Sequence, residues 1–309
     1  MTILIAEGMH EKGIELLHGS GIKTVFPQDR FAKSDIEALI VRSVFQVNEE
    51  VLKEYPRLKI VAKLGTGLDN VDQERCRAAG VEVINAPAMN SVSTAEFTVM
   101  QIIGLYKNAF NIYERVKNRD LRRALYFGNE LAEKTAGVIG CGSVGKNIVS
   151  RLRAFVRQVN VYDKDAGKGE DDGNVRFVER MDELFPESDI LVLSITLKGN
   201  EKLVSRGFLA KLKKDAMVVN TARGALIDEP ALIEFLTENP QARYYCDVLE
   251  DEPNYYKLPE DQDYKNPLLE LNNVCFTPHI AGMTAECQAK IAVEVAGRII
   301  SCATAAQRG

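Results

Sequence analysis

The sequence lacks tryptophan, holds only three histidines, and has no pair of cysteines at the spacing of a zinc site. Its six cysteines are scattered along the chain from Cys76 to Cys302. Scattered cysteines without a framework are typical of reduced thiols in a cytoplasmic protein. We therefore expect no metal site, no disulfide and a cytoplasmic location.

Positive charge is not in excess. The 39 lysines and arginines are outnumbered by 44 aspartates and glutamates, which gives a net charge of −5. This balance argues against a nucleic-acid or anionic-membrane partner, although a local basic pocket is compatible with it. The first residues carry no basic segment and no cleavage site, and no apolar run approaches the ~20 residues that span a bilayer. We expect neither a signal peptide nor a membrane span.

What the sequence does have is a regular alternation of short apolar runs with amphipathic stretches. A length of 309 residues exceeds what one core usually holds, so two domains are expected. The alternation is typical of parallel sheets with helices on both faces. Strands are predicted at 2–6, 38–42, 59–63 and 81–85, and after a break at 136–140, 158–163, 189–195, 216–220, 242–248 and 273–277. One long helix is predicted near 92–117, and another over 284–306.

A glycine-rich motif, GCGSVG at 140–145, follows the strand predicted at 136–140. The bare pattern is weak, but its position between a strand and an amphipathic helix is that of a dinucleotide site. Gly140 permits the tight turn, Gly142 lets the backbone approach a pyrophosphate, and Gly145 lets the helix pack closely. The pyrophosphate would bind the free amides at the helix N-terminus.

Asp163 ends the next predicted strand, 18 residues after Gly145. A carboxylate at this point can bond both ribose hydroxyls and repel a 2′-phosphate, which favours NAD over NADP. The alternatives are a solvated acid at a strand end, and an enzyme in which the neighbouring Lys164 helps to hold the phosphate of NADP.

Three polar residues follow later strands: Arg223 in NTARG, Glu252 in DVLEDEP and His279 in TPHIAG. Together they suit a 2-keto acid. An arginine can hold the carboxylate and polarise the keto oxygen. An imidazolium can protonate that oxygen, and a carboxylate can orient the imidazole and stabilise its charge. Taken singly, each residue has a plain alternative: a loop cap for Arg223, a solvated acid for Glu252 and a hydrogen-bonded structural histidine for His279.

These segments resemble the D-isomer-specific 2-hydroxyacid dehydrogenase family over nearly the whole chain. NTARGALIDEPAL, DVLEDEP and TPHIAGMTAE match the family segments that carry the catalytic arginine, acid and histidine, which map to Arg223, Glu252 and His279. NAPAMNSVSTAEF matches the segment that crosses between domains. The resemblance extends the NAD site beyond the glycines and Asp163 to Ser143, Val144, Thr196, Thr221, Ala222 and Asp247.

The resemblance also implies a substrate site. GTGLDNVD at 65–72 is similar to a loop in which the amides of Thr66 and Gly67 cradle the substrate carboxylate. VRSVFQV resembles the segment in which phosphoglycerate dehydrogenases place an Arg-Ser pair, here Arg42 and Ser43, near a phosphate. Lys63 lies where those enzymes often carry a second cation. Arg42 as a strand-end salt bridge is the alternative.

The sequence departs from the family pattern in one place near the nicotinamide. Where a His-x-Pro-x-Thr stretch is usual, the chain has Ser194, Thr196 and Lys198. This departure bears on the identity of the substrate rather than on the reaction.

The predicted fold is two doubly wound α/β domains. A flavodoxin-like substrate domain is expected from 1–93 and 282–309, and a Rossmann-type NAD domain from 94–281. The resemblance also implies a homodimer packed through the helix at 92–117 and the absence of a regulatory domain. The expected function is hydride transfer between NAD(H) and C2 of a small D-2-hydroxy acid, possible substrates being 3-phosphoglycerate and phosphohydroxypyruvate. The alternatives are a glyoxylate/hydroxypyruvate reductase, a formate or phosphite dehydrogenase and a non-catalytic NAD(H)-sensing protein.

Overall fold

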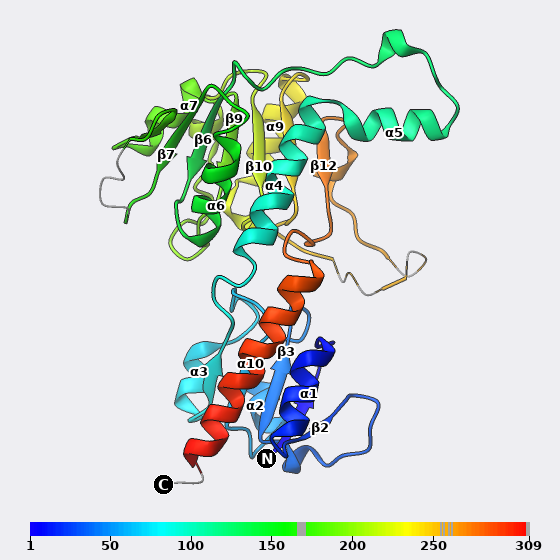
Figure 1. Ribbon diagram of the computed structural model, residues 1–309, viewed down its shortest axis with the longest axis vertical. Coiled ribbons are helices and arrows are strands. Elements are labelled where there is room, and N and C mark those ends of the chain that lie inside the picture. The colour runs from blue at the N-terminus through cyan, green and yellow to red at the C-terminus, as the bar shows by residue number, and fades with distance from the viewer. Residues whose placement is uncertain (166–170, 254, 256, 259, 261, 307–309) are drawn as a thin grey trace. The chain divides into compact units, whose positions relative to one another are not determined.

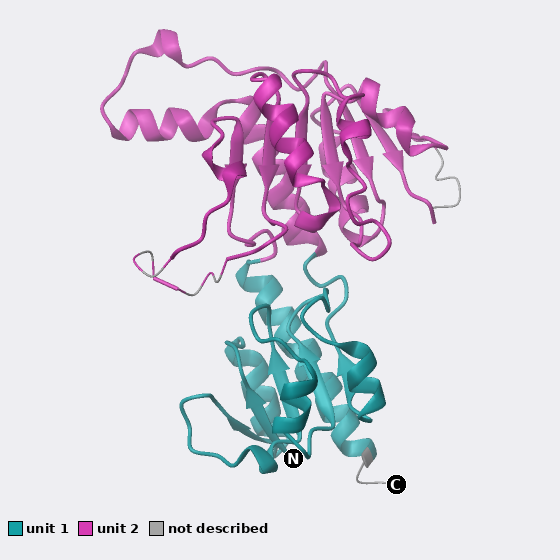
Figure 2. Cartoon of the chain, turned by 180° about the vertical axis from the view of Figure 1, so that it is seen from behind, with its two compact units in different colours: residues 1–90, 283–309 teal, residues 91–282 magenta. Residues whose placement is uncertain are grey.

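A computed structural model of the chain describes residues 1–165, 171–253, 255, 257–258, 260 and 262–306 (Figure 1). The chain forms two compact units (Figure 2). Unit 1 is Met1–Asn90 with Met283–Gly309, and unit 2 is Ser91–Gly282.

Unit 1 is built on a five-stranded parallel sheet in the order β2-β1-β3-β4-β5, which is the flavodoxin-like order. Its strands are β1 (Thr2–Ile5), β2 (Lys23–Val25), β3 (Ala38–Val41), β4 (Ile60–Lys63) and β5 (Glu82–Ile84). Its helices are α1 (Glu11–Gly19), α2 (Glu49–Glu54), α3 (Gln73–Ala78) and α10 (Ala285–Ala306). The sequence did not predict β2, because three residues with a lysine at one end make no apolar run.

Unit 2 is built on a seven-stranded parallel sheet in the order β12-β11-β10-β9-β6-β7-β8. Its strands are β6 (Thr135–Ile139), β7 (Gln158–Tyr162), β8 (Val175–Phe177), β9 (Ile190–Leu193), β10 (Met217–Asn220), β11 (Arg243–Cys246) and β12 (Val274–Phe276). Its helices are α4 (Ser91–Tyr106), α5 (Ala109–Lys117), α6 (Ser143–Leu152), α7 (Leu184–Glu187), α8 (Arg206–Leu209) and α9 (Glu229–Glu238). Short 3₁₀ turns in the two units lie at Lys33–Asp35, Arg123–Leu125, Met181–Glu183, Gly224–Leu226 and Pro267–Glu270.

The predicted class, two doubly wound parallel sheets, is confirmed, but two details of unit 2 were wrong. Six strands were expected and β8 was missed, since it is only three residues long with an arginine at its centre. The single helix expected near 92–117 is divided into α4 and α5. Asn108 lies between them in the left-handed conformation, with φ +56°, which asparagine tolerates better than most residues.

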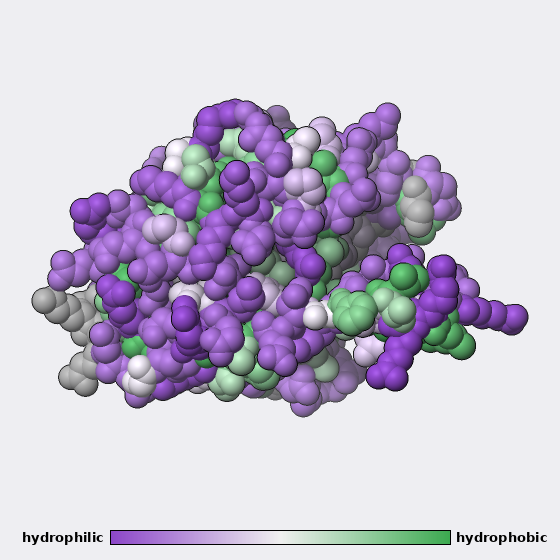
Figure 3. All heavy atoms as spheres, turned by 90° about the horizontal axis from the view of Figure 1, so that it is seen from above, coloured by the Kyte–Doolittle hydropathy of each residue, from purple (hydrophilic) through white to green (hydrophobic). Residues whose placement is uncertain are grey.

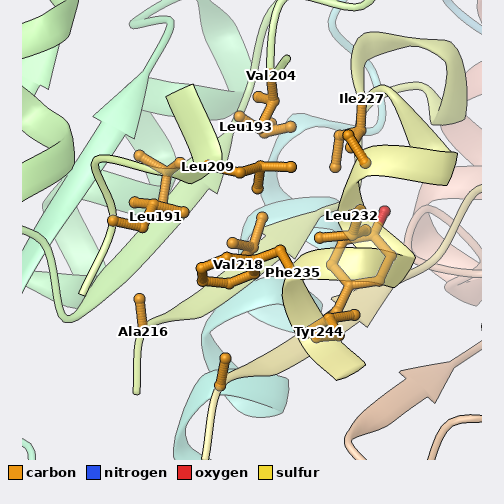
Figure 4. Packing of buried hydrophobic residues seen from close by; sticks show 14 of the residues in the cluster. Leu191, Leu193, Val204, Leu209, Ala216, Val218, Ile227, Leu232, Phe235 and Tyr244 are labelled. Atoms are coloured by element: carbon orange, nitrogen blue, oxygen red, sulfur yellow. The ribbon is translucent and has the colours of Figure 1, made fainter. Parts of the chain in front are cut away.

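The core of unit 2 fixes the strands whose ends carry the candidate site. All four residues of β9 and all four of β10 are buried. In Figure 4, Leu191, Leu193 and Val218 of these strands lie in one apolar cluster with Leu232 and Phe235 of α9. Apolar side chains on both faces of a parallel sheet leave only the strand ends open to ligands. The loops after these strands therefore start from a rigid base.

The outer surface facing the viewer in Figure 3 is mostly hydrophilic, with hydrophobic residues in small patches. Across the described part of the chain, no helix combines the length and apolar character needed to cross a membrane.

Candidate active site

The glycine-rich loop lies where the sheet of unit 2 reverses its strand order. It connects β6 to α6 and passes the end of β9, the neighbour of β6 on the far side of the reversal. Gly140 has φ +96°, and a Cβ there would lie 2.3 Å from the Ser194 carbonyl oxygen. A Cβ at Gly145 would lie 2.1 Å from the Gly140 carbonyl oxygen. Both positions therefore require glycine.

Gly142, by contrast, borders open space, because a Cβ added there meets no atom within 4 Å. It is the N-cap residue of α6, so the first amides of that helix lie beside the opening. A doubly wound sheet binds its ligand at such a reversal, with the pyrophosphate on the helix N-terminus. These residues fit a dinucleotide.

Asp163 follows β7, next to β6, and its carboxylate reaches the glycine-rich loop. One carboxylate oxygen accepts a hydrogen bond from the Cys141 amide at 2.5 Å, and the other accepts from the Asp165 amide at 2.9 Å. The half-buried carboxylate is therefore held beside the loop, while Lys164 is exposed. Burial raises the pKa of the Cys141 thiol, which packs in the apolar core and stays protonated at neutral pH.

His279 and Glu252 are in direct contact. Nδ1 of His279 lies 2.9 Å from each carboxylate oxygen of Glu252. The imidazole is 39% exposed and the carboxylate 29% exposed, so the pair is reachable from solvent. Because Nδ1 faces the carboxylate, Nε2 is the ring nitrogen left to meet a substrate oxygen.

The loop that carries His279 is held by Asp247, whose side chain is 1% exposed. The Asp247 carboxylate accepts hydrogen bonds from the Thr277 hydroxyl at 2.5 Å, the Ile280 amide at 2.9 Å and the Ala281 amide at 2.8 Å. Burial raises the pKa of Asp247, and these three donors oppose that change. The sequence predicted Asp247 to contact NAD, whereas the hydrogen bonds found here join it to the protein.

Arg223 follows β10 and lies close to the segment that carries Glu252. A Cβ at Gly224 would lie 2.0 Å from the Leu249 carbonyl carbon, so the two backbones touch and the position requires glycine. Nη1 of Arg223 donates to the Ala222 carbonyl at 2.6 Å. Since β10, β11 and β12 are neighbours in the parallel sheet, Arg223, Glu252 and His279 all lie at one edge of it.

The other residues predicted to bind NAD lie at the same edge. Ser143 and Val144 open α6, and Thr196 follows β9 with its side chain exposed. The Thr221 hydroxyl lies 3.0 Å from the Thr98 hydroxyl on α4, and the Ala222 amide donates to Asn220.

The residues predicted to bind substrate lie at one edge of the sheet of unit 1. Arg42 and Ser43 follow β3, whereas Lys63 ends β4 and Thr66 and Gly67 follow it. Within the described residues, the amides of Thr66 and Gly67 donate to no other group. Lys63 is 8% exposed and its ammonium donates to Asn70 Oδ1 at 2.5 Å, so its charge is committed inside the protein.

Sequence reasoning missed two residues of this region, Glu7 and Asn70. Glu7 accepts hydrogen bonds from the backbone after β3, and Asn70 bonds the same loop from another side. Their only signal was position, because Glu7 follows a predicted strand and Asn70 lies inside GTGLDNVD.

The two remaining histidines have structural contacts. His10 is the N-cap of α1, and His18 bonds the Thr24 hydroxyl at 2.6 Å. Among the described residues, no group of three or more His, Cys, Asp or Glu is arranged to hold a metal ion.

Curated relatives are similar in sequence to this chain over most of its length. The chain is 34% identical over 97% of its length to D-3-phosphoglycerate dehydrogenase of Methanocaldococcus jannaschii, of which it spans only 57%. It is also 34% identical over 86% of its length to hydroxypyruvate reductase of Thermotoga maritima, of which it covers 84%. Relatives that are named for different substrates therefore share the same sequence identity with this chain.

A solved structure shares the fold. D-lactate dehydrogenase of Aquifex aeolicus, in complex with NAD and lactic acid, superposes with a TM-score of 0.84 at 25% identity, over 99% of this chain and 96% of that one. Residues 99–281 match the family described as D-isomer specific 2-hydroxyacid dehydrogenase, NAD binding domain. The chain therefore belongs to the D-isomer specific 2-hydroxyacid dehydrogenase family and carries its NAD-binding domain.

Proposed function

We propose that the chain transfers a hydride between NAD(H) and C2 of a small D-2-hydroxy or 2-keto acid. The observation that supports this most directly is the contact between His279 and Glu252, at 2.9 Å, beside the loop of Arg223. An acid–base group, its charge partner and a cation at one edge of a dinucleotide-binding sheet are what reduction of a keto acid requires.

In this proposal each residue has a defined role. The Arg223 guanidinium binds the substrate carboxylate and polarises the keto oxygen. NADH, when bound, supplies the hydride. Nε2 of His279 donates a proton to the oxygen as it gains negative charge, and Glu252 stabilises the imidazolium before that transfer. The amides of Thr66 and Gly67, which have no partner among the described residues, hold the substrate carboxylate.

We further propose that the substrate carries a second anionic group, as phosphohydroxypyruvate and 3-phosphoglycerate do. Arg42 supports this, because the residue is half-buried and its guanidinium makes no hydrogen bond or ion pair within the described residues. The similarity to phosphoglycerate dehydrogenases agrees with it. Hydroxypyruvate or glyoxylate is the alternative, supported by the equal similarity to a hydroxypyruvate reductase.

A panel of 2-keto acids assayed with NADH tests this function. We expect activity with several 2-keto acids and the highest kcat/KM with phosphohydroxypyruvate. Equal kcat/KM for phosphohydroxypyruvate and hydroxypyruvate would favour the hydroxypyruvate reductase alternative. Activity with formate or phosphite instead would reject the proposed reaction.

Asp163 is proposed to select NAD over NADP. Asp163→Ala should raise the ratio of kcat/KM with NADPH to that with NADH, because the carboxylate that repels the 2′-phosphate is gone. Asp165→Ala, an exposed acid two residues further on, is the matched control and should leave the ratio unchanged. Wild-type protein that uses both cofactors equally well would contradict the assignment.

We also propose a homodimer joined through α4, α5 and α6. An apolar hollow of about 590 Å³ lies between these helices, lined by Val99, Met100, Ile103, Phe110 and Phe155 among others. Helix α5 and the chain just after it extend away from the sheet (Figure 1). In this part of the chain, Tyr113 is 67% exposed and Phe127 is 78% exposed. Because the hollow and these exposed aromatic side chains belong to the same chain, two-fold pairing buries both at once. Light scattering should give twice the chain mass, and Phe127→Asp should lower it; a monomeric wild type would contradict the proposal.

A further inference from the structure

Glu7 makes an unusual set of contacts with the loop that follows β3. Its carboxylate accepts hydrogen bonds from four consecutive backbone amides. The distances are 2.5 Å from Arg42, 3.3 Å from Ser43, 3.1 Å from Val44 and 3.1 Å from Phe45. Successive amides that converge on one point form a nest, which is a site for an anion. In this chain the anion is a side chain of the protein itself.

The nest lies where the sheet of unit 1 reverses its strand order. Glu7 follows β1 and the loop follows β3, and these two strands are neighbours. The chain runs from β1 to β2 on one side and from β3 to β4 and β5 on the other. A doubly wound sheet binds its ligand at this point. Glu7 therefore occupies, with a negative charge of its own, amides that could otherwise bind an anion of the substrate.

Asn70 fixes the same loop from a second direction. Its side-chain amide donates to the carbonyls of Arg42 at 3.2 Å and Phe45 at 2.7 Å, and its Oδ1 accepts from Lys63. Its backbone carbonyl accepts from the Val47 amide at 2.9 Å. Asn70 is 8% exposed, so these bonds are shielded from water. All four amides of the loop and the carbonyls of Arg42 and Phe45 are therefore occupied, and what the loop offers an anion is its side chains.

We propose that Glu7 is a positioning residue that fixes the loop 42–45 so that the side chains of Arg42 and Ser43 meet the second anionic group of the substrate. The inference rests on the proposed function and assigns the recognition of that group to side chains, not to the amides of the nest. Glu7 itself does not touch the substrate.

Glu7→Gln is the sharpest variant, because it keeps the size of the side chain. It replaces one carboxylate oxygen with an NH₂ group, which cannot accept from the two amides that faced that oxygen. We expect KM for phosphohydroxypyruvate to rise about tenfold, which corresponds to ~1.4 kcal/mol. The kcat for both substrates and the KM for hydroxypyruvate should change by less than about twofold. A general loss of structure would instead change all four constants, which are the kcat and the KM for each substrate.

Hydrogen exchange on the NADH-bound protein provides a second readout that does not depend on the substrate. In Glu7→Gln, the amides of residues 42–45 should exchange faster, and the rest of the protein should exchange as in wild type. Glu15→Gln is the matched control, an exposed glutamate on α1, and should change neither exchange nor KM. Unchanged exchange at 42–45 would overturn the inference.

Arg42→Ala separates failure of the inference from failure of the proposed substrate. If Arg42→Ala raises KM for phosphohydroxypyruvate and Glu7→Gln does not, Glu7 does not position the loop and the inference alone is wrong. If Arg42→Ala leaves that KM unchanged, the contact to a second anionic group is wrong and the inference falls with it.

Discussion

Replacing His279 with alanine is expected to lower kcat for 2-keto acid reduction by ~10²–10⁴, the usual contribution of a positioned acid–base group. The structure gives the reason. Nδ1 of His279 is held by Glu252 at 2.9 Å, and the backbone amide of His279 is held by the carbonyls of Asp247 and Thr277. The ring is thus fixed with Nε2 available to one oxygen. NADH binding should stay nearly intact, which fluorescence titration can measure.

The matched control is His18→Ala. His18 is exposed and lies in unit 1, and its side chain bonds only Thr24 among the described residues, so its removal should leave kcat unchanged. Wild-type kcat in His279→Ala, under conditions where the chemical step limits turnover, would mean that another group donates the proton.

The same pair predicts opposite pH dependence in the two directions. Reduction begins with the imidazolium and should fall as pH rises, whereas oxidation begins with the neutral imidazole and should fall as pH drops. The Glu252 carboxylate lies 2.9 Å from Nδ1 and stabilises the imidazolium that reduction requires. Glu252→Gln removes this negative charge, so kcat for reduction should fall more than kcat for oxidation. If neither rate changes, Glu252 does not stabilise the imidazolium of His279.

Replacing Arg223 with alanine is the second large effect. We expect kcat/KM to fall by ~10²–10³, as when a group that stabilises developing negative charge is removed. KM should rise and kcat should fall, because one guanidinium is proposed to bind the carboxylate and to polarise the keto oxygen. Arg223→Lys keeps the charge but loses the planar two-pronged donor, so it should recover only part of the activity.

Arg206→Ala is the control for this experiment. Arg206 is exposed on α8 and pairs with Glu234, so its loss should leave both constants unchanged. If Arg223→Ala changes KM but keeps the wild-type kcat, Arg223 serves substrate binding alone.

The fold was predictable because buried parallel strands appear in a sequence as short runs of apolar residues. Strands such as β9 and β10, with every residue buried, stand out in the sequence. What could not be predicted depends on tertiary contacts or on single backbone angles. β8 is a three-residue strand at the end of the sheet, next to β7, and the division between α4 and α5 rests on the left-handed conformation of Asn108.

The candidate site was predictable in so far as its polar residues come directly after predicted strands. Arg223, Glu252 and His279 follow three strands that prove to be neighbours, which a sequence pattern alone does not establish. The bonds of Lys63 and Glu7 were not predictable, because they join residues from different loops. Whether a cation such as Lys63 faces a ligand or an asparagine is decided only by the fold.

The most direct test of the central claim is to follow the hydrogen itself. The protein is given a 2-keto acid that it reduces, with NADH that carries deuterium at both positions of C4 of the nicotinamide, and the product is analysed by NMR and chiral chromatography. We predict deuterium at C2 of the product and the D-isomer alone. A product without deuterium at C2, or one of L or mixed configuration, would contradict hydride transfer to C2 by a D-specific dehydrogenase.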